Sequence, residues 1–440
     1  MTRRPVFLAA LACATLVRLL ALPLPGTEDV GTWKIWAYGA SSHVTYVYGV
    51  GGTPPVRGVV TWNQHETTVD YPPAAMYELA LVGFAYRAID PSFADGGLLN
   101  AMVKIPGLLA GAMLTWLLAW TAGRFTRSAS TAAWAALAYW LNPATVLNAE
   151  VLGYLDPLMM LPAVAALVLL HVGAAESAGV CFAVALLTKP QAILVGPAFA
   201  LAAWHMGSRS WLRAGGGAAL AAIVLLLPFA ITGALPNMWL AFGSFYTRRN
   251  ILSGNAANVW WIANYLSRAW NQRLTLGARA FFQPVRRVMA ISTFQEQGFP
   301  NPRPFATAAA MGVAGFGIWR LRHNRDLASH ALAAALSIHA FCVLSVGVHE
   351  NHLIFVVPFL TLAAALEPSI RPLFYAVSAI AALNLNLFYG IGRGWGYSLP
   401  RMMLGIDLSV LLSLANIAAL VWHARVVSRM GKVTTAQPSL

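Results

Sequence analysis

Cysteine and charge are both scarce in this chain of 440 residues. It has three Cys and 10% charged residues, where soluble domains average about 25%. Cys13, Cys181 and Cys342 each lie inside an apolar stretch without pairing or metal-ligand spacing, so we expect no disulfide and no zinc. We also expect no cofactor, because the sequence lacks the alternating strand and helix pattern of a nucleotide-binding fold. The low charge, 58% hydrophobic residues and mean hydropathy of +0.63 exclude a soluble enzyme and a disordered chain.

Lysine is rare as well. The 29 basic residues include only four Lys (Lys34, Lys104, Lys189 and Lys432), which leaves 25 Arg, and the net charge is +14. This excess of positive charge does not indicate nucleic acid as a partner, because the Arg residues are scattered in short loops between apolar runs. Such loops are typical of the cytoplasmic side of a membrane protein, so we expect the lipid bilayer as the partner.

Apolar runs long enough to cross a bilayer occur along the whole chain. The first, after Arg3 and Arg4, resembles a signal peptide, but Arg18 interrupts it and no clear cleavage site follows, so we interpret it as a retained span. The twelve expected spans are 6–24, 99–122, 129–148, 155–173, 177–189, 190–206, 214–233, 304–320, 328–347, 352–366, 371–390 and 402–423. The predicted fold is all-α and polytopic, in one membrane-embedded domain of residues 1–440.

Basic loops set the orientation. They fall on one side only if residues 73–90 form a juxtamembrane or re-entrant helix in the first outer loop instead of a crossing. Both termini and a tail at 424–440 are then cytoplasmic, the outer loops are 25–72 and 234–303, and the plasma membrane is the default location. Most polar residues that interrupt the apolar runs gather on the outer side, where ionisable groups at membrane depth are usually functional.

The first outer loop begins and ends with acidic residues. Glu28 and Asp29 follow the first span directly, and a carboxylate at the rim of a membrane cavity is suited to be a general base. The alternative is a polar collar in which Asp29 is the N-cap of a helix that begins near Val30. Asp70 and Tyr71 precede two prolines that fix the backbone direction as the chain returns to the membrane, although a simple turn also explains them.

Two later positions suggest phosphate and substrate binding. Asp156 lies at an outer corner that begins at Asn142 and also contains Glu150. Lys189 lies where two apolar runs meet; it either extends to the interface or holds a phosphate. Arg248 and Arg249, in the long outer loop, are further candidates for phosphate binding.

The late segment His349–Glu350–Asn351–His352 joins two apolar runs. His349 and His352 have a spacing that suits a metal on a helix, but no third ligand is evident, so we favour hydrogen bonding to sugar hydroxyls or phosphate. Asn258 and Trp260 supply an amide and a flat apolar face for a sugar ring; interfacial anchoring explains the Trp equally well.

These motifs, in this order over residues 26–352, resemble the GT-C superfamily of polytopic glycosyltransferases that use polyprenyl-phosphate sugars. Glu28-Asp29 matches the acidic pair of its first outer loop. Asp70-Tyr71-Pro72-Pro73 and Val348-His349-Glu350 look like motifs of dolichyl-phosphate-glucose glucosyltransferases. Asn142-Pro143 through Asp156 and Thr188-Lys189-Pro190-Gln191 are more similar to bacterial polyprenyl-phosphate-mannose mannosyltransferases. The His-rich glucosyltransferase motif and a soluble C-terminal domain are absent from the sequence.

The resemblance implies transfer of a single hexose, mannose or glucose, from a polyprenyl-phosphate donor to a lipid-linked or cell-envelope acceptor. It implies Asp29 as the base, with Glu28 or Asp70 orienting the acceptor, and Lys189 with Arg248 or Arg249 holding phosphate. His349, Glu350 and Asp156 then bind sugar or phosphate. The alternatives are a transporter or lipid flippase, a polymer ligase that transfers a whole lipid-linked glycan, and a non-catalytic membrane subunit. A transporter agrees less well, because the two halves show no internal repeat.

Overall fold

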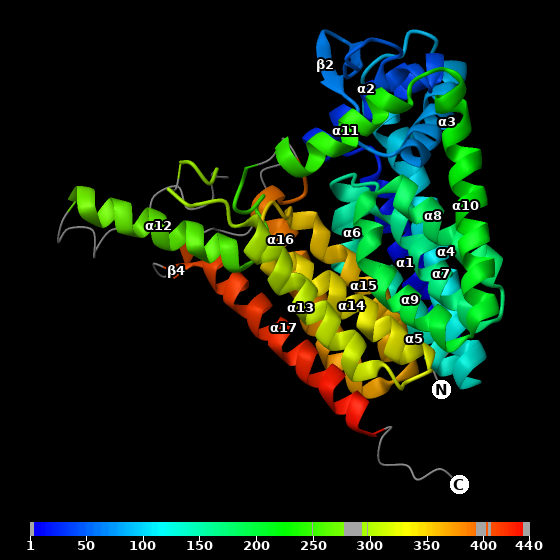
Figure 1. The fold of residues 1–440 in the computed structure, drawn as a ribbon, viewed down its shortest axis with the longest axis vertical. Helices are drawn as coiled ribbons and strands as arrows, with labels where there is room; N and C mark the ends of the chain where they lie inside the picture. The colour runs from blue at the N-terminus through cyan, green and yellow to red at the C-terminus, as the bar shows by residue number, and fades with distance from the viewer. Residues whose placement is uncertain are drawn as a thin grey trace. The chain divides into compact units, whose positions relative to one another are not determined.

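The computed structural model describes residues 4–248, 250–276, 293–296, 298–392, 402–403 and 406–433. The chain forms two compact units. Unit 1 comprises residues 1–248 and 391–396, and unit 2 comprises residues 249–390 and 397–440. Nearly all of the regular structure is α-helical, as the sequence predicts (Figure 1).

The apolar helices of unit 1, together with the single-turn helix α6, lie side by side as a bundle. They are α1 (Arg4–Ala21), α4 (Gly97–Thr126), α5 (Ala129–Trp140), α6 (Pro143–Val146), α7 (Asp156–His171), α8 (Ala175–Thr188), α9 (Gly196–His205) and α10 (Ser208–Ile231). A π-helical turn, η2 (Leu147–Val151), follows α6, and a 3-10 turn, η3 (Pro190–Val195), precedes α9. The span expected at 129–148 is thus interrupted by a change of helix type, whereas η3 begins at Pro190, where the sequence predicts the boundary between the spans 177–189 and 190–206.

Local sequence explains these interruptions. The Asn142 side chain accepts a hydrogen bond from Ala144 N at 3.0 Å, and Pro143 occupies the first position of α6, so Asn142 is an N-cap that starts a new helix. The α8 helix ends at Thr188 because Lys189 has extended backbone angles and Pro190 follows it. Both breaks place polar side chains at helix ends.

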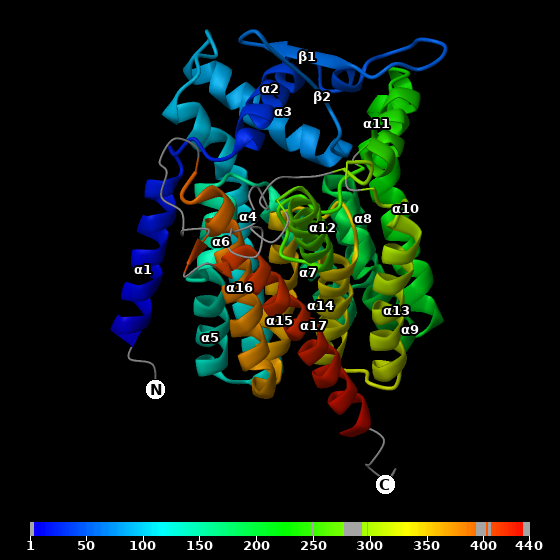
Figure 2. The ribbon, with the colours of Figure 1, turned by 90° about the vertical axis from the view of Figure 1, so that its left-hand side faces the viewer.

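The segment expected as the first outer loop and its juxtamembrane helix folds into a small layer, named the outer layer here, at one end of the unit 1 bundle (Figures 1 and 2). It contains α2 (Glu28–His43), the 3-10 turn η1 (Tyr46–Tyr48), strands β1 (Val59–Trp62) and β2 (His65–Thr68), and α3 (Pro73–Ile89). The two strands are antiparallel, with Trp62 opposite His65, and the tight turn uses left-handed backbone angles at Asn63 and Gln64. The helix α11 (Leu235–Arg248) lies at the same end. The expected juxtamembrane helix at 73–90 is α3, which packs against α2.

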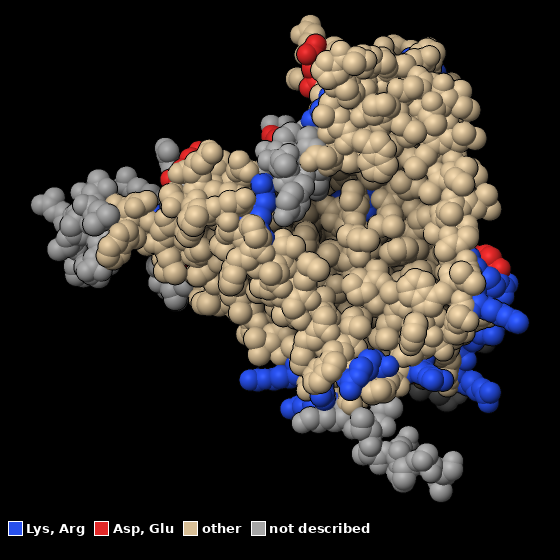
Figure 3. Space-filling view, viewed as in Figure 1, with Lys and Arg blue, Asp and Glu red and all other residues tan. Residues whose placement is uncertain are grey.

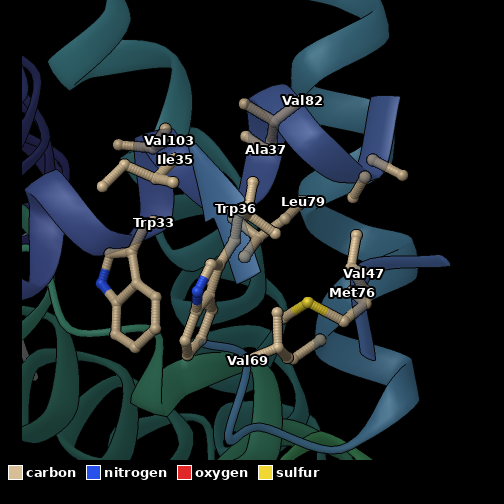
Figure 4. Packing of buried hydrophobic residues seen from close by; sticks show 14 of the residues in the cluster. Trp33, Ile35, Trp36, Ala37, Val47, Val69, Met76, Leu79, Val82 and Val103 are labelled. Carbon is tan, nitrogen blue, oxygen red and sulfur yellow. The ribbon is translucent and has the colours of Figure 1, made fainter. Parts of the chain in front are cut away.

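An aromatic and aliphatic core fixes this outer layer on the bundle. Trp33 and Trp36 extend side by side from α2, with Val69 and Met76 nearby (Figure 4). The ring centres of Trp33 and Trp36 are 5.0 Å apart, and that of Tyr71 lies 4.9 Å from Trp33. Because such rings bury large apolar areas, they hold Tyr71 firmly at the base of the layer.

Unit 2 is a second helical bundle. Its helices are α12 (Val259–Leu276), α13 (Arg303–Leu321), α14 (Leu327–Leu344), α15 (Val356–Leu366), α16 (Arg371–Tyr389) and α17 (Leu408–Val433). The 3-10 turns η5 (Glu350–Phe355) and η6 (Pro368–Ile370) flank α15, and β3 (Met402–Met403) pairs with β4 (Ile406–Asp407) before α17. The last expected span, 402–423, therefore starts later, at Leu408, and the helix continues through much of the segment expected as a tail.

Several helices have the length and composition of membrane spans. Within the described ranges, five are long and apolar enough to cross a bilayer: Gly97–Thr126, Ser208–Ile231, Leu327–Leu344, Pro368–Tyr389 and Leu408–Gly431. Four shorter apolar helices are Pro5–Ala21, Asp156–His171, Ala175–Thr188 and Glu350–Leu366. The chain is a multi-pass membrane protein.

Candidate functional site

A buried ion pair lies at the outer-layer end of the unit 1 bundle. Lys189 Nζ donates to Asp156 Oδ1 at 2.5 Å, and Asn148 Nδ2 donates to Asp156 Oδ2 at 2.9 Å. Asp156 is fully buried, and Lys189 is 5% exposed. Two sequence-predicted residues are thus in direct contact, and each compensates the charge of the other.

The breaks in the helices create this pair. Asp156 is the first residue of α7, where its negative charge is favoured by the N-terminal end of the helix dipole. Lys189 is the extended residue between α8 and η3. Inside a continuous helix, a side chain faces either the lipid or the neighbouring helices. At these breaks, the side chains of Asp156 and Lys189 extend past the helix ends and meet.

Tyr71 joins the pair from the outer layer. Its ring centre lies 5.5 Å from Lys189 Nζ, within reach of a cation–π interaction. Burial raises the pKa of the Tyr71 hydroxyl above its usual value; the Lys189 ammonium opposes the rise, and the carboxylates of Asp156 and Asp29 add to it. Tyr71 is therefore a neutral phenol at neutral pH, and the charge of Asp29 acts on the same site.

The acidic pair of the first outer loop is divided by the fold. The α2 helix begins at Glu28 with Thr27 at the N-cap position, so Asp29 lies inside the first turn and is not the N-cap. Glu28 is exposed to solvent, whereas Asp29 is half-buried. Of the two, only Asp29 combines partial burial with an electrostatic effect on Tyr71, as suits a general base.

Asp70 acts on a different tyrosine. Burial raises the pKa of the Tyr48 hydroxyl well above its usual value, and the Asp70 charge is the second cause. Tyr48 donates from its hydroxyl to the backbone oxygen of Tyr71 at 2.6 Å. Tyr48 thus fixes the backbone of Tyr71, and Asp70, the first residue of the Asp-Tyr-Pro-Pro segment, acts electrostatically on Tyr48.

The late His-Glu segment forms a second polar cluster, in unit 2. Gly254 N donates to Val348 O at 2.8 Å, and Glu350 N donates to Gly254 O at 3.1 Å, so the loop before α12 pairs with the start of η5. A Cβ atom on Gly254 would lie only 2.7 Å from His349 Nδ1, so this approach requires glycine. Glu350 and His352 are buried, while His349 is partly open.

A small cavity lies beside this second cluster. It is lined by Ala256, Ala257, Cys342, Val348, His349, Glu350, Leu353, Asn384 and Asn416. Asn416 Nδ2 donates to Ala257 O at 2.7 Å, and Asn384 Nδ2 donates to Asn255 O at 3.2 Å. Amides from α16 and α17 therefore hold the loop that faces His349.

Asn258 and Trp260 have hydrogen-bonding roles within the protein. Asn258 Oδ1 accepts from Trp261 N at 2.9 Å and is fully buried, which makes it the cap of α12. Trp260 Nε1 donates to Leu344 O at 2.7 Å. Both residues support the loop near His349. Of the two Arg candidates, Arg248 is the last residue of α11 and its side chain is outside the described part, as is the whole of Arg249.

Metal coordination finds no support in the described residues, where no three His, Cys, Asp or Glu side chains lie close enough to share an ion. His349 Nδ1 and Glu350 Oε2 are 3.9 Å apart, and His352 Nδ1 accepts from His349 N at 3.3 Å. The two histidines therefore belong to a hydrogen-bonded turn.

Sequence reasoning missed a buried arginine. Arg18 was interpreted only as an interruption of the first span, yet its Nη1 donates to Glu150 Oε2 at 2.5 Å, and both side chains are almost fully buried. Arg18 Nη2 also donates to Trp140 O and Thr145 Oγ1, and the guanidinium lies over the Trp140 ring. The sequence did contain a signal for this pair: a cation within an apolar span costs free energy, so Arg18 predicts a buried acidic partner.

Apolar helices with carboxylate, amide and cationic side chains gathered at their ends define an integral membrane protein with a polar site. The model of glycosyltransferase family 87 matches residues 71–346, and the chain belongs to this family. The chain is a multi-pass membrane glycosyltransferase of the GT-C superfamily, as its motifs predicted.

The chain is also distantly similar to a solved structure. Among solved structures, the chain is similar to the crystal structure of ArnT from Cupriavidus metallidurans in the apo state. The identity is 14% and the TM-score is 0.43, with 98% of this chain and 78% of that chain covered. No curated protein sequence matches the chain.

Proposed function

We propose that the protein transfers a single hexose, mannose or glucose, from a polyprenyl-phosphate donor to a hydroxyl of a lipid-linked or cell-envelope acceptor. The observation that carries this proposal is the unit 1 cluster, in which the half-buried Asp29 acts electrostatically on Tyr71, and Tyr71 lies beside the Lys189–Asp156 pair. A base and a cation near one point are what such a transfer needs.

The donor already has a competent leaving group. The acceptor oxygen attacks the anomeric carbon and forms the new glycosidic bond, while the bond from that carbon to the phosphate oxygen breaks. The acceptor proton passes to Asp29, and the bonding electrons leave with the polyprenyl phosphate. Lys189, beside the neutral Tyr71 hydroxyl, stabilises the negative charge that develops on the phosphate.

The pairing of Lys189 with Asp156 has a consequence for this step. The carboxylate holds the ammonium in one place before the donor arrives, so little reorganisation is needed when phosphate binds. Asp156 thus acts by positioning the cation. In unit 2, taken by itself, the side chains of His349 and Glu350 bind sugar or phosphate through hydrogen bonds.

We place the reaction on the outer face of the plasma membrane, with both termini in the cytoplasm. In unit 1, basic residues lie at the helix ends opposite Lys189: Arg124, Arg127, Arg209 and Arg213. In unit 2 they lie at the ends opposite His349: Arg320, Arg322, Arg325, Arg371, Arg425 and Arg429. Lys and Arg gather at these ends in Figure 3. The positive-inside rule assigns such ends to the cytoplasm.

A direct transfer assay tests the activity. Membranes containing the wild-type chain are incubated separately with radiolabelled polyprenyl-phosphate mannose and polyprenyl-phosphate glucose, and label in lipid and envelope fractions is counted. We expect transfer from one donor, and none with membranes that contain Asp29→Asn at the same protein level. Transfer from neither donor by folded wild-type protein contradicts the proposal.

Orientation is tested separately by accessibility. Single cysteines are introduced at exposed Glu28 and at exposed Arg322 in a background in which Cys13, Cys181 and Cys342 are replaced by serine. In right-side-out vesicles we expect a membrane-impermeant maleimide to label position 28 and not position 322. The reverse pattern contradicts the outer location of the site.

A further inference from the structure

A buried lysine that the mechanism does not use holds the corner before α7. Lys104, on α4, is 1% exposed. Its Nζ donates to Leu24 O at 2.7 Å, Glu150 O at 2.9 Å and Val151 O at 3.1 Å. An ammonium has three N–H donors, so all three are used on backbone carbonyls. One side chain thus ties the chain after α1 to the turn η2.

The next two carbonyls of the same corner bind the start of the outer layer. Leu152 O accepts from Thr27 N at 3.0 Å and from Thr27 Oγ1 at 3.3 Å. Gly153 O accepts from Trp33 Nε1 at 3.0 Å. Together with the Lys104 bonds, four consecutive carbonyl oxygens of the corner, 150 to 153, bind donors from α4 and from residues 27–33.

Two glycines permit this close approach. Gly26 and Gly153 both have left-handed backbone angles, with φ of +71° and +80°. A Cβ atom on Gly26 would lie 2.7 Å from Leu152 O, and one on Gly153 would lie 2.9 Å from Lys104 Cε. The contact between the two segments is therefore built into the backbone at both sides, and Lys104 lies directly in it.

The contact between residues 24–33 and the corner 150–153 links the segments that carry Asp29 and Asp156 of the proposed mechanism. On one side, Asp29 follows Thr27 by two positions; on the other side, Asp156 follows Gly153 by three. Lys104 itself contacts neither. Loss of its bonds would release three carbonyls in a nearly water-free place and would weaken the tie between the two segments.

We propose that Lys104 is a positioning residue for sugar transfer. Its ammonium fixes the segment that carries Asp29 against the corner that carries Asp156, and so sets the separation between the base and the Lys189 cation. This inference rests on the proposed function. Because rates depend steeply on the distance between reacting groups, a small shift of Asp29 reduces turnover more than donor binding.

The test compares three variants of the full-length protein in lipid nanodiscs. Lys104→Met removes the donors and keeps the side-chain length, and Lys104→Arg keeps donors at the same place. Lys34→Met is the matched control, because Lys34 is another buried lysine of unit 1, on α2, and pairs instead with half-exposed Asp95 at 2.6 Å. Rates are expressed per folded molecule, from the monodisperse fraction in size-exclusion chromatography.

For Lys104→Met we expect kcat to fall by at least about tenfold while the donor KM changes by less than about threefold. We expect Lys104→Arg to recover part of kcat and Lys34→Met to stay within about twofold of wild type. An unchanged kcat per folded molecule in Lys104→Met, or an equal loss in Lys34→Met, overturns the proposal.

Hydrogen exchange supplies a readout that does not depend on activity. Peptides that cover 24–33 and 150–156 should exchange faster in Lys104→Met than in wild type or Lys34→Met. Unchanged exchange overturns the proposal even if the enzyme slows. If wild type transfers no sugar from any donor, the proposed function fails, and the exchange result still decides whether Lys104 ties the two segments.

A milder variant covers the case in which Lys104→Met does not fold. Trp33→Phe removes only the bond from Nε1 to Gly153 O and keeps an aromatic ring in the core. We expect a smaller effect of the same kind as in Lys104→Met: kcat falls by about threefold and the donor KM does not change. A wild-type kcat in this variant overturns the proposal.

Discussion

Lys189 Nζ lies 2.5 Å from Asp156 Oδ1, and both side chains are buried at the point where α7 begins and α8 has just ended. The two residues are 33 positions apart in the chain. An ion pair in such a place is stable only because each charge has its partner and because Asn148 also donates to Asp156. The pair is therefore both a structural element of unit 1 and a prepared cation for phosphate.

Separate replacement of the two partners should give different kinetics. Lys189→Met leaves the Asp156 carboxylate buried without its cation and removes the phosphate ligand, so we expect kcat/KM to fall by at least about a hundredfold. Asp156→Asn keeps the cation and should lower kcat/KM less. Steady-state kinetics with the polyprenyl-phosphate donor measures both, and an equal effect of the two changes would contradict the assignment.

The acidic pair of α2 offers a comparison between neighbours. Asp29→Asn removes the proposed base from the half-buried position, so we expect kcat to fall by about a hundredfold or more while the donor still binds. Glu28→Gln changes an exposed carboxylate, and kcat should fall by less than about tenfold. Single-turnover measurements with saturating acceptor distinguish the two, and a larger effect of Glu28→Gln would reverse the roles.

The Arg18–Glu150 pair makes a prediction about stability. Glu150→Gln leaves Arg18 buried without an opposite charge, so we expect a loss of about 3–5 kcal/mol in the free energy of unfolding. The double variant Arg18→Met, Glu150→Met should recover much of that loss, because no charge remains to be buried. Thermal unfolding followed by tryptophan fluorescence compares the three proteins. A double variant less stable than the single one would disagree with this account.

Glu78 on α3 should make stability depend on pH. Burial raises the pKa of its carboxyl from 4.5 to about 8. The folded chain then binds this proton more tightly than the unfolded chain does, so stability is highest below pH 4.5 and falls as the pH rises toward about 8. We expect Glu78→Gln to lose this contribution to the pH dependence and to raise Tm at pH 8 by roughly 2–4 °C. An equal slope of Tm against pH in both proteins would contradict the burial of this group.

The sequence predicted the candidate residues better than their partners. Asp156 and Lys189 were selected because charges are rare in apolar runs, but their mutual contact depends on how α7 packs against α8. For Asn258 and Trp260, packing adds partners that the sequence does not reveal: Asn258 caps α12 and Trp260 donates to Leu344 O, and sugar binding by these residues stays a prediction. The sequence does not reveal the partners of Arg18 and Lys104, because each lies within a run that already satisfies the expectation of a span.

Composition and periodicity by themselves determined that this is a helical membrane protein and which carboxylates interrupt its apolar runs. These properties are local, since they follow from the transfer of each segment between water and lipid and from the backbone limits of Pro, Gly and Asn. Only the tertiary structure decided that Arg18 pairs with Glu150, Lys189 with Asp156, and Lys104 with three carbonyls. A buried charge requires a partner, but which partner it finds is set by the packing of helices that are distant in the chain.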